Sequence, residues 1–450
     1  MQTMTMKGLL ALILLTSLLL GAGPAFSQGD VAFGVTETTI DFPDSILFQT
    51  HVTGAGPDIV KAQFVYYLDR YGASDSTTRE PLTLEPGPTQ DLRYHWDTSA
   101  LTILPWTPIV FYWRITDAQG NSYESAPQKV YYADTRFQWQ QRASDNLIIH
   151  WHDKPEDFGQ KVFEIAQQAI QKQQRLFGKA LVIPIRIVIY NDRREFTDWH
   201  SVALDWVGGE AFPDFGLTTQ IVNSSRPDQH WLMAVVPHEI SHLYLYQTAH
   251  NASAPIPVWL DEGLAQYNEF ADSGTDYLVT QAAQNGNLLP LTSLAAGFGQ
   301  FDEPRIRLSY AEALSAVTYL AETYGESGIS QLLAAYKQGL PTEQAFKMAL
   351  GISMGQFQQD WAVWVGAPAE SMITPTPWPK PTFRPTPTPM QIGESTNTPT
   401  ASATATPAPT PAPTPAPAPT PTPAPTSDKP WCPGLIILLP LPLIALLWRQ

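Results

Sequence analysis

The sequence HEISH, at residues 238–242, decides how this chain is interpreted. On an α-helix, positions i and i+4 lie on the same face, so the imidazoles of His238 and His242 can bind one metal ion. Glu239 lies beside them and can act on a water molecule at the same ion. Pro237 directly precedes the first histidine, which predicts either a kink in the helix or a helix that begins there.

A second helix is expected over Val258–Tyr267 (VWLDEGLAQY), and it supplies Glu262. Two histidines and a glutamate form the ligand set of many catalytic zinc sites, in which the fourth position holds a water. Zinc would lower the pKa of that water towards about 7, and Glu239 would take its proton as the water attacks a carbonyl. The predicted Zn²⁺ ligands are therefore His238, His242 and Glu262, and the predicted general base is Glu239.

These two motifs resemble those of the gluzincin metallopeptidases, which include the thermolysin-like enzymes and the zinc aminopeptidases. The chain is most similar to the peptidase MA-like family of bacterial surface proteins, over roughly residues 137–366. The resemblance implies a hydrolase of the HExxH-x19-E type that cleaves peptide bonds, with the same ligands and base. Thermolysin-like enzymes place an Asp four residues after the ligand Glu, where this chain has Gln266. Asp261 is the candidate for the role of that Asp, which is to orient a histidine.

Peptide hydrolysis also needs a hydrogen-bond donor for the oxyanion that forms when water attacks the carbonyl. The resemblance implies a tyrosine for this task at the start of a helix beyond the third ligand, and Tyr310 is the candidate. The alternative, that Tyr310 is a packing residue, stays open. Residues 208–222 are interpreted as an edge strand along which an extended peptide pairs. His150 and His152 share one face of a strand and are interpreted as half-exposed residues without a metal.

The composition excludes several classes of protein. The chain has 450 residues, with 26 Lys and Arg against 42 Asp and Glu, which gives a net charge of -16. This acidic balance argues against binding to nucleic acid, which needs clustered basic residues. The single cysteine excludes an intramolecular disulfide and a zinc site made of cysteines.

The folded part of the chain is predicted to contain two domains. Residues 31–135 consist of short β-branched and aromatic runs between turns, which predicts an all-β sandwich of immunoglobulin or fibronectin III type. This domain carries no titratable cluster, so it is interpreted as a spacer or as a module that binds an unknown surface or protein ligand. Residues 137–368 are predicted to form an α+β zincin-like metallopeptidase domain whose C-terminal half is helical.

The two ends predict export and anchoring. Residues 1–27 have the pattern of a secretory signal peptide. Residues 373–430, which are rich in Pro, Thr and Ala, are expected to be a disordered linker or stalk. Residues 431–450 are apolar and are either a transmembrane segment or a sorting signal whose tail is removed. The protein is thus expected outside the cytoplasm, anchored by its C-terminus to the cell membrane or cell surface.

Together these features predict a cell-surface zinc peptidase that acts on a peptide or protein substrate. The alternative is a catalytically silent metallopeptidase-like surface protein with a binding or adhesion role. All four motif residues are present, which favours the enzyme, because a silent relative would more often have lost Glu239.

Overall fold

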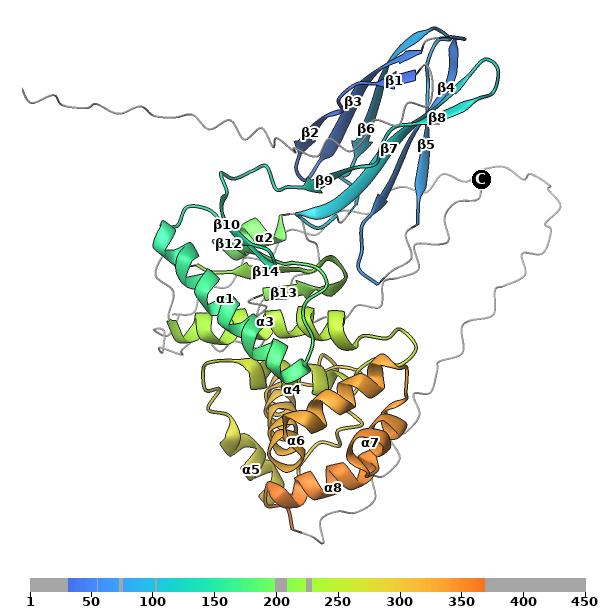
Figure 1. Ribbon diagram of the computed structural model, residues 1–450. Helices are drawn as coiled ribbons and strands as arrows, with labels where there is room; N and C mark the ends of the chain where they lie inside the picture. Colours follow the sequence, from blue (N-terminus) through green and yellow to red (C-terminus); the bar gives the residue numbers. More distant parts are fainter. Residues whose placement is uncertain are drawn as a thin grey trace, which may run out of the picture. The chain divides into compact units, whose positions relative to one another are not determined.

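The computed structural model describes residues 31–368, except for residues 55, 73–75, 102, 199–208 and 224–228 (Figure 1). These residues form two compact units. The described part of the first unit consists of residues up to 167, 181–198 and 209–223, and that of the second of residues 168–180 and 229–368. The predicted signal peptide, stalk and C-terminal apolar segment lie outside the described residues, and the predicted domain boundaries stay predictions.

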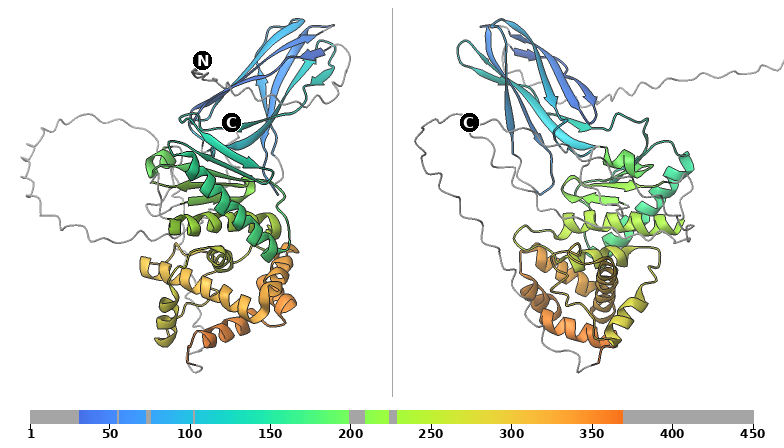
Figure 2. Two further views of the ribbon diagram at one scale, coloured as in Figure 1. Left: turned by 60° about the vertical axis from the view of Figure 1, so that its left-hand side comes forward. Right: turned by 180° about the vertical axis from the view of Figure 1, so that it is seen from behind.

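The N-terminal part of the first unit is a β-sandwich whose two antiparallel sheets lie face to face (Figures 1 and 2). In β3, every second side chain from Ile46 to Val52 is buried, as a half-buried strand requires. One core is filled from both sheets, for example by Phe48 and Phe64, whose ring centroids are 4.6 Å apart. The predicted β-rich N-terminal region is therefore confirmed. The first sheet contains β1 (Val31–Phe33), β2 (Glu37–Asp41), β3 (Ser45–Gly54) and β6 (Thr89–Asp97), and the second contains β4 (Ile59–Leu68), β5 (Thr78–Leu82), β7 (Thr107–Asp117), β8 (Ser122–Glu124) and β9 (Gln128–Tyr132).

A five-stranded sheet with the order β10-β11-β12-β14-β13 follows in the same unit. Its three inner strands are parallel, and the two outer strands run antiparallel to their neighbours. Of the predicted edge segment 208–222, only β13 lies at the edge, whereas β14 lies between β12 and β13. The elements are β10 (Gln140–Ser144), β11 (Leu147–Trp151), α1 (Glu156–Phe177), β12 (Ile185–Tyr190), α2 (Arg193–Thr197), β13 (Gly209–Phe212), the 3₁₀ turn η1 (Pro213–Phe215) and β14 (Leu217–Ile221).

The prediction that His150 and His152 are half-exposed is wrong, since their exposed fractions are 1% and 0%. The ring of His150 stacks on Trp106 with centroids 3.8 Å apart, and that of His152 stacks on Phe137 at 4.2 Å. Both aromatic residues come from chain segments that precede β10, and this long-range packing excludes water from the two imidazoles.

The second unit is helical, which confirms the predicted helical half of the peptidase domain (Figure 1). Helix α6 begins after an N-cap formed by Asp302. Gly325, with φ of 70°, interrupts its helical backbone. Besides the end of α1, the helices are α3 (Gln229–Ala249), α4 (Val258–Asn268), α5 (Asp276–Gln284), α6 (Glu303–Lys337), α7 (Thr342–Leu350) and α8 (Met354–Trp364).

Helix α4 is held firmly at two places. Its first N–H groups have no side-chain cap and donate instead to the carbonyl oxygens of Leu294 and Ala295. Gly263 lies against α6, where a Cβ atom would come within 2.3 Å of the carbonyl oxygen of Ala313. Only glycine permits this close approach of the two helices, and it fixes the helix at the residue next to Glu262.

Among the residues that the structure describes, no helix combines the length and the apolar character needed to cross a bilayer.

Candidate metal centre

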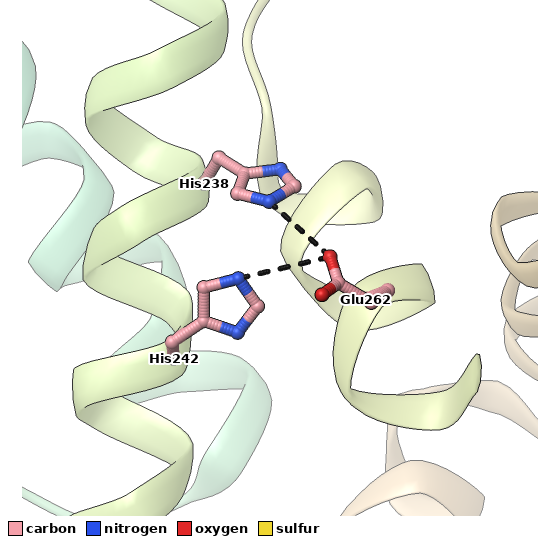
Figure 3. A group of neighbouring side chains, drawn as sticks. All are labelled: His238, His242 and Glu262. Atoms are coloured by element: carbon pink, nitrogen blue, oxygen red, sulfur yellow. Dashed lines mark ion pairs between the residues drawn. The ribbon is translucent and has the colours of Figure 1, made fainter. Parts of the chain in front are cut away.

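Helices α3 and α4 bring the three predicted ligands together (Figure 3). His238 and His242 lie one turn apart on α3, and Glu262 points at both of them from α4. The distance from Glu262 Oε2 to His238 Nε2 is 3.5 Å, and that to His242 Nε2 is 3.9 Å. The ligand atoms of all three residues lie within 4.8 Å of one another. The structure thus brings together the side chains of His238, His242 and Glu262, as the sequence predicted.

The interior of the unit holds the two helices in this arrangement. From Val235 to Ala249, α3 is buried at every residue except Tyr246, as expected for a helix that is apolar on most sides. Asn268, at the end of α4, donates from its side-chain nitrogen to Ser241 Oγ at 3.0 Å, and both residues are buried. This bond ties α4 to the turn of α3 that carries the ligands.

The three facing atoms fit a zinc ion. His238 Nε2, His242 Nε2 and Glu262 Oε2 are buried and have no hydrogen-bond partner, although leaving such atoms unpaired costs about 1–3 kcal/mol each. Zinc bonds of about 2.0–2.2 Å at tetrahedral angles separate the ligand atoms by about 3.3–3.6 Å. The observed 3.5 and 3.9 Å need only a small closure. Two imidazoles and a carboxylate are also donors that suit zinc.

Two further carboxylates hold the histidine rings in place. Asp261 Oδ1 lies 2.7 Å from Nδ1 of His242, and Glu269 Oε1 lies 2.8 Å from Nδ1 of His238. When each Nδ1 donates its proton to a carboxylate, each Nε2 presents a lone pair to the metal position. Asp261 was suggested for this role by the sequence, whereas Glu269 was missed. The sequence marks Glu269 only as an acidic residue that directly follows the end of α4.

The site favours positive charge on its histidines. Burial alone would lower the pKa of His238, but the neighbouring carboxylates of Glu262 and Glu269 outweigh burial and raise the pKa well above the usual value. For His242 burial again lowers the pKa, and the charge and hydrogen bond of Asp261 raise it overall. Surplus negative charge at the centre is what a divalent cation would neutralise.

Glu239 lies on α3 between the two histidines in sequence and is 1% exposed. Its Oε2 has no hydrogen-bond partner. Burial raises the pKa of Glu239, while the nearby charges of His238 and His242 act in the opposite direction. A raised pKa brings a carboxylate closer to the value at which it can accept and return a proton near neutral pH.

Tyr310 lies in α6 and is 1% exposed. Its ring packs edge-on against Phe298, with centroids 4.9 Å apart. This contact gives the side chain a packing role. The contact with Phe298 involves the ring of Tyr310, whereas the predicted role in oxyanion binding involves its hydroxyl. That role therefore stays a prediction.

Comparison with known proteins supports a peptidase. Residues 165–367 match the family model of the Peptidase MA superfamily, which confirms the resemblance found in the sequence. The match includes α3, α4 and α6, and therefore all of the predicted site residues. No curated protein matches the chain.

Similar solved structures are only distantly related. Catalytically inactive OgpA from Akkermansia muciniphila, in complex with an O-glycopeptide, is 18% identical, with a TM-score of 0.19. The match covers 23% of this chain and 30% of OgpA, so the chain spans less than a third of that protein. An aminopeptidase N family protein from Idiomarina loihiensis is 10% identical over 74% of this chain and 75% of its own, with a TM-score of 0.36. These values are too low to indicate a shared substrate.

Proposed function

We propose that this chain, whose residues 165–367 match the Peptidase MA superfamily, is a zinc-dependent peptidase of the gluzincin type. The observation that carries the proposal is the convergence of three buried, unpaired ligand atoms of His238, His242 and Glu262. The alternative is a silent surface protein with a binding or adhesion role. A buried Glu239 with an unpaired oxygen favours the enzyme, because binding alone does not need it.

Each site residue has a defined task in peptide hydrolysis. When bound, Zn²⁺ supplies a Lewis acid that polarises the scissile carbonyl and makes water more acidic. His238, His242 and Glu262 would hold the ion, and Asp261 fixes the ring of His242 through Nδ1. Glu239 would accept a proton from the attacking water at Oε2 and later deliver it to the leaving amine.

Metal removal tests this proposal directly. The purified protein should cleave members of a peptide library, lose this activity when a chelator removes its metal, and regain it when Zn²⁺ is added back. Cleavage that persists without metal would refute the zinc mechanism. Zinc binding without cleavage of any peptide or protein would support the alternative binding role.

We also propose that the hydroxyl of Tyr310 donates to the developing oxyanion. Tyr310→Phe keeps the ring that packs on Phe298 and removes only the hydroxyl. Loss of one oxyanion donor is expected to lower kcat by about 10²- to 10³-fold. An unchanged kcat would show that Tyr310 serves only in packing.

The cell surface is the proposed location, with the β-sandwich as a module for an unknown surface or protein ligand. This proposal rests on the signal pattern of residues 1–27, the proline-rich residues 373–430 and the apolar residues 431–450. A protease added to intact cells is expected to release a fragment that contains the metal centre, by cutting within residues 373–430. Complete protection in intact cells, with cleavage only after lysis, would contradict an external location.

A further inference from the structure

The proline that precedes the first histidine lies inside α3, eight residues after the helix begins at Gln229. A proline has no N–H, so Pro237 cannot donate to the carbonyl oxygen of Met233, four residues earlier. The N–H of Phe270, from the chain that follows α4, donates to this oxygen at 2.8 Å. The carbonyl that Pro237 leaves without its helical donor is therefore where the chain after α4 docks.

Lys172 of α1 makes a second set of contacts with the end of α4 and the chain that follows it. Helix α4 ends at Asn268, and Glu269 takes an extended conformation (φ −57°, ψ 154°), so the chain leaves the helix axis there. Lys172 of α1 donates to the carbonyl oxygen of Tyr267 at 2.9 Å, and its ammonium lies 5.6 and 5.5 Å from the ring centroids of Tyr267 and Phe270. Residues 267–270 are thus fixed by both α1 and α3.

This path places a carboxylate at the metal centre. Side chains on a helix lean towards its N-terminus, so the ring of His238 lies over the turn of α3 that precedes it. Met233 lies at the start of that turn, and docking of Phe270 brings its neighbour Glu269 to Nδ1 of His238. The carboxylate is 12% exposed. Gln266, four residues after Glu262, does not take this place, because its side-chain oxygen is buried without a partner.

We propose that Pro237 and Glu269 act together as a positioning device for the metal centre. Pro237 leaves the carbonyl of Met233 to Phe270, and the resulting path of the chain sets Glu269 to orient His238. The inference rests on the proposed function, in that His238 is taken as a metal ligand. Glu269 is a positioning residue, since it acts through His238 and does not face the metal position itself.

The test measures metal binding without any peptide. The Zn²⁺ dissociation constant of the purified protein is obtained by competition with a chelator, and the visible absorption spectrum of the Co²⁺ form reports the ligand geometry. Glu269→Gln is expected to weaken zinc binding by about 10- to 100-fold and to change the Co²⁺ spectrum. The matched control is Glu326→Gln. Glu326 is exposed, and its charge acts on Lys172 as that of Glu269 does. The Glu326→Gln variant should bind zinc as the wild type does.

The role of the proline is tested by Pro237→Ala. Alanine brings back an N–H that competes with Phe270 for the carbonyl of Met233, so zinc binding should weaken by about 3- to 10-fold, the equivalent of one hydrogen bond. Alanine favours the helix more than proline does, so the free energy of unfolding of the metal-free protein should not fall. When Glu269→Gln is already present, Pro237→Ala should not weaken zinc binding further, because it acts through Glu269.

The possible results separate the two proposals. If the wild type binds no zinc, the proposed function fails. If the wild type binds zinc and Glu269→Gln binds it equally well with the same Co²⁺ spectrum, only the positioning device is overturned. An additive loss in the double variant would remove Pro237 from the device. Should Glu269→Gln not fold, Glu269→Asp, which keeps the charge and shortens the reach, carries the same expectation.

Discussion

Replacing Glu239 by glutamine is expected to slow peptide cleavage strongly while the metal stays bound. Glutamine has nearly the same shape as glutamate, but it cannot take a proton from water. Loss of a general base lowers kcat by about 10²- to 10⁴-fold. Glu239 is not one of the three residues whose ligand atoms lie together. The zinc content should therefore remain equal to that of the wild type. The measurement is kcat on a cleaved peptide, with zinc determined in the same sample.

The control for this variant is Glu322→Gln, which changes an exposed glutamate on α6 and should leave both values unchanged. Two results would contradict the assigned role. If Glu239→Gln cleaves as fast as the wild type, the proton is accepted elsewhere. If it loses its zinc, Glu239 belongs to the ligand set and the assignment of Glu262 needs revision.

Loss of one ligand should remove the metal. His242→Ala deletes one of the three proposed ligands, and we expect zinc binding weaker by on the order of 10³-fold or more, with peptidase activity lost in parallel. The variant should also lose the rise in melting temperature that zinc gives the wild type, because a ligand that binds only the folded state stabilises it more when it binds more tightly. His250→Ala is the matched control, since His250 directly follows α3, stacks on Tyr246 and is not part of the ligand group.

Zinc content, the chelator-competition constant and the melting temperature check this prediction together. A His242→Ala protein that keeps one equivalent of zinc would show that the metal binds elsewhere. Equal losses in His242→Ala and His250→Ala would point to general damage to the helix and not to a ligand. The prediction therefore depends on the difference between the two histidines.

That His238, His242 and Glu262 come together could be predicted because each lies in a strongly patterned helix. The four-residue spacing of His238 and His242 fixes their common face once a helix forms, and Glu262 lies in a second strongly patterned helix. Features set by a few neighbouring residues could thus be predicted from the sequence.

Features set by distant contacts could not. The sequence predicted that Pro237 marks either a kink or the start of a helix. In the structure eight helical residues precede it, so Pro237 lies inside α3. Glu269 reaches His238 only because Phe270 docks on Met233, which lies 37 residues earlier in the chain. His150 is buried for a similar reason, since the Trp106 ring that covers it comes from another part of the unit.

Crystals of the zinc-loaded protein measured at the zinc absorption edge would test the central claim most directly. We predict one strong anomalous peak about 2 Å from His238 Nε2, His242 Nε2 and a carboxylate oxygen of Glu262. The same crystals should show Glu269 and Asp261 against the two Nδ1 atoms. A peak at other residues, or no peak between α3 and α4, would contradict the proposal that this group of side chains is a zinc centre.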